Sequence, residues 1–190
     1  KYFHRQGESR YEIISFYRSF HGRTMGALSA TGQTKFRTGF EPMLPGFQFA
    51  KYNDLESVSK LVNEKTAAVM VECVQAEGGV HPADVKFLQD LRALTKEKGI
   101  FLIVDEVQTG VGRTGKMWGY QHYGIEPDMM TCAKALGAGL PMGALLVNNQ
   151  AATGFQPGDH ASTFGGNPVV SAAALAALET MLLKDLVSHA

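Results

Sequence analysis

Four charged residues could share one chemical task, because each ends an apolar segment or lies in the loop that follows one. They are Arg23, Glu77, Asp105 and Lys134. In open α/β sheets, ligands bind beyond the carboxyl ends of the strands, which is where these residues would gather. Their spacing along the chain is irregular, so only the fold could bring them together.

Lys134 closes an apolar run that begins at Pro127, and the small residues Ala-Leu-Gly-Ala-Gly follow it. A partly buried lysine amine can lose its proton and attack a carbonyl, which forms a Schiff base. The alternative is a strand-end lysine whose stem reaches water. The residues alone leave both interpretations open.

Asp105 follows five apolar residues, 100–104, that begin after Gly99. Such an unbroken run predicts a central strand of a parallel sheet, covered on both faces. A carboxylate buried at its end needs a partner. If that partner is a pyridine nitrogen, the carboxylate keeps it protonated and the ring becomes an electron sink. The alternatives are a helix cap or a structural ion pair.

Composition limits the class of protein. The chain has 190 residues, 45% hydrophobic and 19% charged, so we expect a globular chain with one sizeable core. Eighteen basic and 18 acidic residues cancel, which gives no general field for nucleic acid or an anionic membrane. We expect Cys73 and Cys132 to be buried free thiols, and the histidines have no metal-ligand spacing.

Hydrophobic patterns and cap residues predict the order of elements. Strands are expected at 11–16, 47–52, 66–72, 100–104, 127–134 and 143–147. Helices are expected from Asn53 or Asp54 to 64, from Asp84 to 98 with Gly99 as the stop, and from Asn167-Pro168 to 186. Loops are expected at 17–26, 32–46, 109–119 and 151–166. The alternation predicts an α/β fold with a mainly parallel sheet and no dividing linker.

One rival interpretation uses the same central stretch. An apolar strand with Asp-Glu is similar to a Walker B segment, and residues 110–116 nearly match a phosphate-binding P-loop. The match fails at Met117, where a Ser or Thr should hold Mg²⁺. A nucleotide triphosphatase is therefore disfavoured.

Seven segments together resemble the class III (ornithine/acetylornithine-type) aminotransferases, which use pyridoxal phosphate and have fold type I. The segments follow the family's order and cover nearly the whole chain: 19–24, 26–32, 40–46, 71–79, 104–115, 133–137 and 162–168. The resemblance implies the large domain of that fold, a mainly parallel sheet flanked by helices. The segment from Phe20 through residue 42 most resembles the acetylornithine type.

The resemblance also implies roles for residues around the cofactor. Lys134 would form the Schiff base and shuttle the proton, and Asp105 would pair with the pyridine nitrogen. Gln108 would bond near the phenolic oxygen, and Phe20 would stack on the ring. Thr163 would donate to the phosphate across a dimer interface.

The same resemblance completes the set. Glu106 and Val107 belong with the cofactor-binding residues. Arg23 would bind the substrate carboxylate as a fork, and Ser162 would touch the same substrate. Glu77 would be the switch glutamate that adapts the site to a dicarboxylate.

The implied reaction moves the terminal amino group of N-acetylornithine, or ornithine, to 2-oxoglutarate, within arginine and ornithine metabolism. A homodimer without nucleic-acid or membrane partners is expected, in a soluble intracellular setting (cytoplasm in a bacterium, or an organelle matrix). One alternative is another ω-aminotransferase, which would use ornithine, succinylornithine or 4-aminobutyrate. The other is an inactive truncated dimerisation domain.

The sequence departs from the family's pattern in two respects. Cys73 and Ala76 stand where Pro and Gly are more usual, which makes the placement of Glu77 less certain. The chain is also expected to be the central part, residues 1–190, of the cofactor-binding domain. The expected fragment would lack the upstream segment that cradles the phosphate and the small C-terminal domain. His21 is expected to be structural rather than catalytic.

Overall fold

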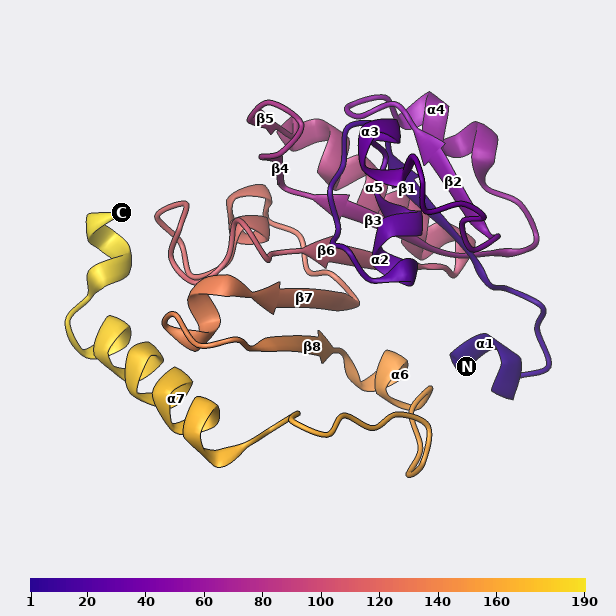
Figure 1. The fold of residues 1–190 in the computed structure, drawn as a ribbon. Helices are drawn as coiled ribbons and strands as arrows, with labels where there is room; N and C mark the ends of the chain where they lie inside the picture. Colours follow the sequence, from indigo (N-terminus) through magenta and orange to yellow (C-terminus); the bar gives the residue numbers. More distant parts are fainter.

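A six-stranded sheet forms the centre of the computed structural model, which describes residues 1–190 (Figure 1). The strands are β1 (Glu12–Phe16), β2 (Phe47–Ala50), β3 (Thr66–Glu72), β6 (Phe101–Asp105), β7 (Met129–Ala133) and β8 (Gly143–Val147). Their order is β2-β1-β3-β6-β7-β8, and every pair is parallel except β7 and β8. A separate antiparallel pair is formed by β4 (Val74–Gln75) and β5 (His81–Pro82). The predicted α/β class and mainly parallel sheet are confirmed.

The main core lies between one face of the sheet and two helices, α4 (Leu55–Leu61) and α5 (Val85–Lys98). Alternate strand residues point into it because side chains in a strand alternate between faces. Phe16 packs edge-on against Phe87 of α5, with ring centroids 5.8 Å apart. Leu102, at the centre of β6, is 0% exposed. Each large side chain buried here contributes roughly 1.5–3 kcal/mol.

The other face of the sheet is only partly covered. A small cluster joins Phe3 of α1 (Tyr2–Arg5) and Ala151 of α6 (Asn149–Ala152) to Ala68 and Phe101. A cavity of about 380 Å³ adjoins this cluster, and Ile103 is half-buried. The expectation that the central strand is covered on both faces is therefore met only in part.

The long helices begin where the cap residues predicted; α5 also ends as predicted, and α4 ends at Leu61, before the predicted 64. Asp54 accepts a bond from the Ser57 backbone N–H at 2.9 Å, and Asn167 does the same for Val170 at 3.0 Å. Gly99 ends α5 in the left-handed conformation, at φ 61°. The last helix, α7 (Pro168–Leu183), ends a few residues before the predicted 186. No helix has both the length and the apolar character needed to cross a bilayer.

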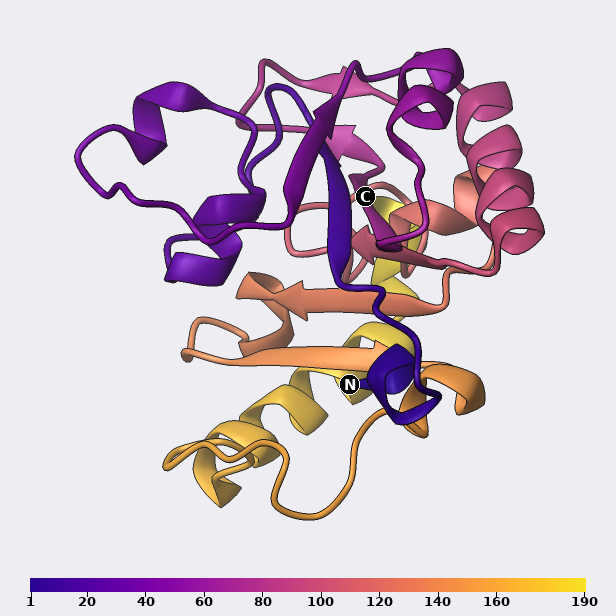
Figure 2. The same ribbon diagram turned by 90° about the vertical axis from the view of Figure 1, so that its right-hand side faces the viewer.

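Four short helices were missed by the sequence prediction. Two lie between β1 and β2, namely α2 (Met25–Ala30) and α3 (Thr34–Arg37), and the others are α1 and α6. Helices of four to six residues are too short to show a 3.6-residue period, so tertiary contacts decide them. Figure 2 shows α5 on one side of the strands and the segment with α2 and α3 on the other.

The two cysteines are free and buried, as expected. Burial raises the pKa of the Cys73 thiol, with the charge of Glu106 as a second cause, so this thiol stays protonated. The Cys73 carbonyl also accepts bonds from the hydroxyls of Tyr52, at 3.2 Å, and Tyr123, at 3.1 Å.

The tight packing of β6 gives a direct test of the fold. Leu102→Ala should lower the free energy of unfolding by roughly 2–5 kcal/mol, because it removes buried methyl groups and leaves a cavity. Val85→Ala is the control, since Val85 is 52% exposed and should change stability by less than about 0.5 kcal/mol. Urea unfolding measures both, and equal midpoints for the two variants would contradict this core.

Candidate active site

A row of polar side chains crosses three strands at their carboxyl ends. Glu72 on β3 lies opposite Asp105 on β6, and Asp105 lies opposite Thr131 on β7. Residues in register on adjacent strands point to the same face. The strand order therefore brings together side chains that lie far apart in the sequence.

Asp105 is 5% exposed. One of its carboxylate oxygens already accepts two hydrogen bonds. Its Oδ1 accepts bonds from the Val107 backbone N–H at 3.0 Å and the Thr131 hydroxyl at 3.1 Å. Its Oδ2 lies 2.7 Å from Nδ1 of His21. A carboxylate has about four acceptor positions. One position on Oδ2 is therefore left for a further donor, such as the N–H of a protonated pyridine ring.

His21 orients this carboxylate from the segment that follows β1. Its side chain is fully buried, and its backbone N–H donates to the Thr31 hydroxyl at 3.0 Å. Its Nε2 is buried without a partner. The sequence suggested a structural histidine. The structure adds that it contacts Asp105, a role no local pattern could reveal because the two residues are 84 positions apart.

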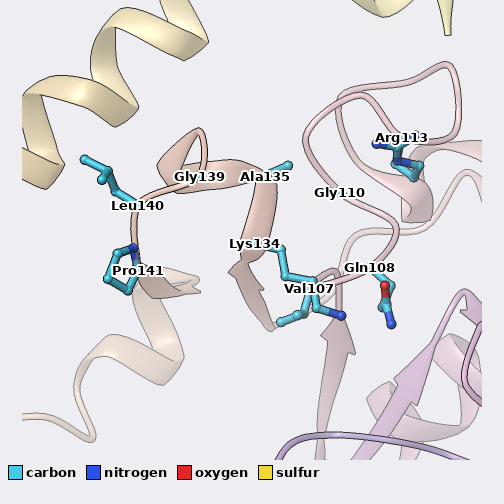
Figure 3. A pocket seen from close by; sticks show the side chains of 9 residues that line it. All are labelled: Val107, Gln108, Gly110, Arg113, Lys134, Ala135, Gly139, Leu140 and Pro141. Carbon is cyan, nitrogen blue, oxygen red and sulfur yellow. The ribbon is translucent and has the colours of Figure 1, made fainter.

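Lys134 begins the 3₁₀ helix η2 (Lys134–Gly137), directly after β7. Its φ of 47° lies in the left-handed region, which residues other than glycine seldom adopt. It makes no side-chain hydrogen bond or ion pair, so its amine is available. Lys134, Val107 and Gln108 line one cavity of about 590 Å³, and Figure 3 shows their side chains close together.

Arg23 rests on two aromatic rings. Its guanidinium lies 4.5 Å from the centre of the Phe36 ring and 5.5 Å from that of Phe20. The two rings meet edge-on at 5.3 Å. Arg23 has no ion pair, so the stacked guanidinium can receive an anion. The sequence does not indicate this role of Phe36, because α3 lies within residues 32–46, which are predicted to be a loop.

Glu106 faces away from this row and holds a loop in place. It is 1% exposed, and its oxygens accept bonds from the Thr109 hydroxyl at 2.6 Å and the Gly119 and Tyr120 backbone N–H groups at 2.9 and 2.7 Å. These bonds give Glu106 a structural task in the loop, and its expected part in cofactor binding stays a prediction.

The loop held by Glu106 also removes the P-loop alternative. Residues 109–118 lead into a 3₁₀ helix, η1 (Gly119–Tyr123), rather than the α-helix that a P-loop needs. Gly110 packs so closely that a Cβ there would lie 2.8 Å from the Trp118 ring. The 3₁₀ helix and the Met117 mismatch together disfavour a P-loop here.

Glu77, Ser162 and Thr163 make no hydrogen bond or ion pair with the row of Glu72, Asp105 and Thr131 in this chain. Glu77 is exposed between β4 and β5 and has no ion pair. Ser162 and Thr163 are exposed between α6 and α7, and Ser162 lines a different cavity with Pro141 and Met142. Neither Ser162 nor Thr163 makes a side-chain hydrogen bond in this chain, so their expected roles stay predictions.

The sequence prediction also missed Glu72 as a site residue, although it places this residue at the end of the strand 66–72. It is 4% exposed, and its Oε2 accepts a bond from the Phe20 backbone N–H at 3.1 Å. It thus ties the segment that carries Phe20 and His21 to the end of β3.

The loop anchored by Glu106 should be sensitive to loss of a single donor. Thr109→Val should lower the free energy of unfolding by about 1.5–3 kcal/mol, because the hydroxyl bonds to a charged group in a buried position. Thr38→Val is the matched control, since its hydroxyl bonds to the Thr34 carbonyl at the surface. Hydrogen exchange at Gly119 and Tyr120 measures the loop directly. Unchanged protection of these amides would show that Glu106 does not hold it.

Comparison with known proteins gives a consistent result. The family described as Aminotransferase class-III matches residues 1–190. Proteins named acetylornithine aminotransferase from Aquifex aeolicus and Gloeobacter violaceus are 53% and 54% identical, over 89% and 94% of this chain. The chain spans about half the length of the curated relatives it matches, 45% and 44% in these two cases.

Solved structures agree with the sequence comparison. The ornithine aminotransferase of Toxoplasma gondii superimposes with a TM-score of 0.89 at 34% identity, over 95% of this chain and 43% of that one.

Proposed function

Because the chain belongs to the aminotransferase class-III family, we propose that it forms the cofactor-binding core of a pyridoxal phosphate-dependent aminotransferase. One observation carries the proposal: an unpartnered lysine amine and a buried carboxylate with a free acceptor position lie at the ends of neighbouring strands, β7 and β6. These are the two protein groups that this cofactor requires.

Each residue of the row has a role toward the bound cofactor. When bound, pyridoxal phosphate supplies an electron sink for charge that develops on the substrate carbon. Asp105, held in place by His21 and Thr131, would accept the ring N–H. Lys134 would supply the amine that holds the cofactor and would move a proton. Phe20 would cover one face of the ring.

The remaining cofactor contacts come from the loops. Gln108 and Val107 line the cavity beside Lys134 and would contact the ring from the end of β6. Thr163 would donate to the phosphate. Thr163 is exposed, and the proposed role places it at the interface of a homodimer, where it would reach the partner's cavity.

We propose N-acetylornithine as the amino donor and 2-oxoglutarate as the acceptor. The support is the name of the relatives near 53% identity. Arg23 would bind a substrate carboxylate, helped by Ser162, and Glu77 would adapt the site to the second substrate. Free ornithine is the second candidate, because the Toxoplasma gondii neighbour is an ornithine aminotransferase. Relative rates with the two donors distinguish them.

The test of the cofactor role is an absorbance spectrum of the full-length protein with pyridoxal phosphate. A near-visible band that shifts when the amino donor is added is expected, and it should be absent in Lys134→Ala. Lys86→Ala is the control, because the Lys86 side chain is 85% exposed and lies on α5. An identical band in Lys134→Ala would contradict the assignment, as would the absence of any band in the wild type.

The aromatic support of Arg23 gives a second test. Phe36→Leu should raise KM for the carboxylate substrate about two- to fivefold, the equivalent of the roughly 0.5–1 kcal/mol that an exposed cation–π contact contributes. Phe49→Leu is the matched control, because Phe49 supports Arg37 in the same way at 5.1 Å, on the edge strand β2. Equal KM values for the two variants would show that Phe36 does not position Arg23.

A further inference from the structure

The proposed roles of Asp105 and Phe20 leave one buried carboxyl group of the site unexplained. Glu72 is 4% exposed and lies opposite Asp105 on the adjacent strand. The two side chains point to the same face of the sheet, because they are in register on parallel strands. Two carboxylates that share a buried site cannot both be charged without strong repulsion.

The hydrogen bonds indicate which of the two holds the proton. Asp105 has contacts with three donor groups, from His21, Val107 and Thr131. Glu72 accepts one bond, from the Phe20 N–H, and its Oε1 has no partner in the protein. Donors stabilise the ionised form of a carboxyl group. Asp105 is therefore the better place for the negative charge and Glu72 the better place for the proton.

The charges around Glu72 also favour a protonated Glu72 beside an ionised Asp105. Burial raises the pKa of Glu72 from its ordinary 4.5 to about 8, and the Phe20 N–H opposes that rise. Asp105 on β6 raises this pKa further, Lys134 after β7 lowers it, and Glu77 between β4 and β5 raises it. The group is thus surrounded by two negative charges and one positive charge.

We propose that Glu72 is a positioning residue of the active site, a neutral carboxylic acid that fixes Phe20 and leaves Asp105 as the charged partner of the cofactor ring. The inference rests on the proposed function, since Phe20 and Asp105 take their roles from it. Glu72 acts through the backbone of Phe20 and through the charge of its neighbour, and it needs no contact with the substrate.

The protonated state can be tested without the cofactor. An unfolded glutamate ionises near 4.3, so between about pH 5 and 8 the folded protein holds a proton that the unfolded chain releases. Stability of the wild type must then fall as pH rises through this window. Glu72→Gln carries no titrating proton and should lose this dependence. Relative to the wild type, the unfolding equilibrium constant of Glu72→Gln should fall by up to about tenfold per pH unit, and this difference should level off above pH 8.

The measurement is urea unfolding of the cofactor-free, full-length protein from pH 5 to 9, for wild type, Glu72→Gln and the control Glu64→Gln. Glu64 is exposed and unpaired, so its variant should follow the wild type at every pH. A Glu72→Gln curve parallel to wild type would overturn the inference, because Glu72 would then be ionised at neutral pH.

The positioning role has its own readout. Glu72→Ala leaves the Phe20 N–H without an acceptor and should weaken pyridoxal phosphate binding about tenfold, a loss of the size expected for a buried unsatisfied donor. Glu72→Gln keeps an acceptor oxygen and should restore binding at pH 7. Weak pyridoxal phosphate binding in both Glu72→Ala and Glu72→Gln would overturn the inference that Glu72 acts as a neutral acid.

The two proposals fail in different ways. If the wild type binds no pyridoxal phosphate while Glu72→Gln still removes the pH dependence, the proposed function is wrong and the protonated Glu72 is supported. If the wild type binds the cofactor and the unfolding curves stay parallel, the inference about Glu72 is wrong and the proposed function is unaffected.

Discussion

The buried charge of Asp105 is the constraint on which the site depends. A carboxylate in this position is stable only if donors surround it, and they come from His21 after β1, Val107 after β6 and Thr131 on β7. These contacts fasten three separate segments to one point. The same contacts leave one acceptor direction open, and that direction gives the carboxylate its proposed chemical use.

Sheet register turns this constraint into a site. Asp105 lies between Glu72 and Thr131 because β6 pairs in parallel with both neighbours. A shift of one residue would send Asp105 to the opposite face and place Val104 in the row. The neighbouring Glu106 is used differently: it holds the loop that forms one wall of the Lys134 cavity. The two adjacent carboxylates thus differ in role: Asp105 is the proposed partner of the cofactor, and Glu106 stabilises a loop.

The sequence predicted all six strands of the main sheet and its three long helices, because long apolar runs and cap residues such as Asp54 and Gly99 are local signals. The family resemblance drawn from seven segments is confirmed by the match over residues 1–190. The short helices α2 and α3 were missed, and with them the support that Phe36 gives to Arg23.

Contacts between distant segments explain the other gaps. The His21–Asp105 contact and the bond from Phe20 to Glu72 join residues 84 and 52 positions apart, so no local pattern contains them. The left-handed φ of Lys134 is likewise set by its surroundings rather than by its residue type. The roles expected of Ser162 and Thr163 stay predictions.

The central claim is that Asp105 keeps the cofactor ring nitrogen protonated. The most direct measurement is the nitrogen NMR signal of ¹⁵N-labelled pyridoxal phosphate bound to the full-length protein, in wild type and in Asp105→Asn. The account predicts a protonated ring nitrogen in the wild type and an unprotonated one in Asp105→Asn, which has the same shape without the charge. The same signal in both proteins would contradict it.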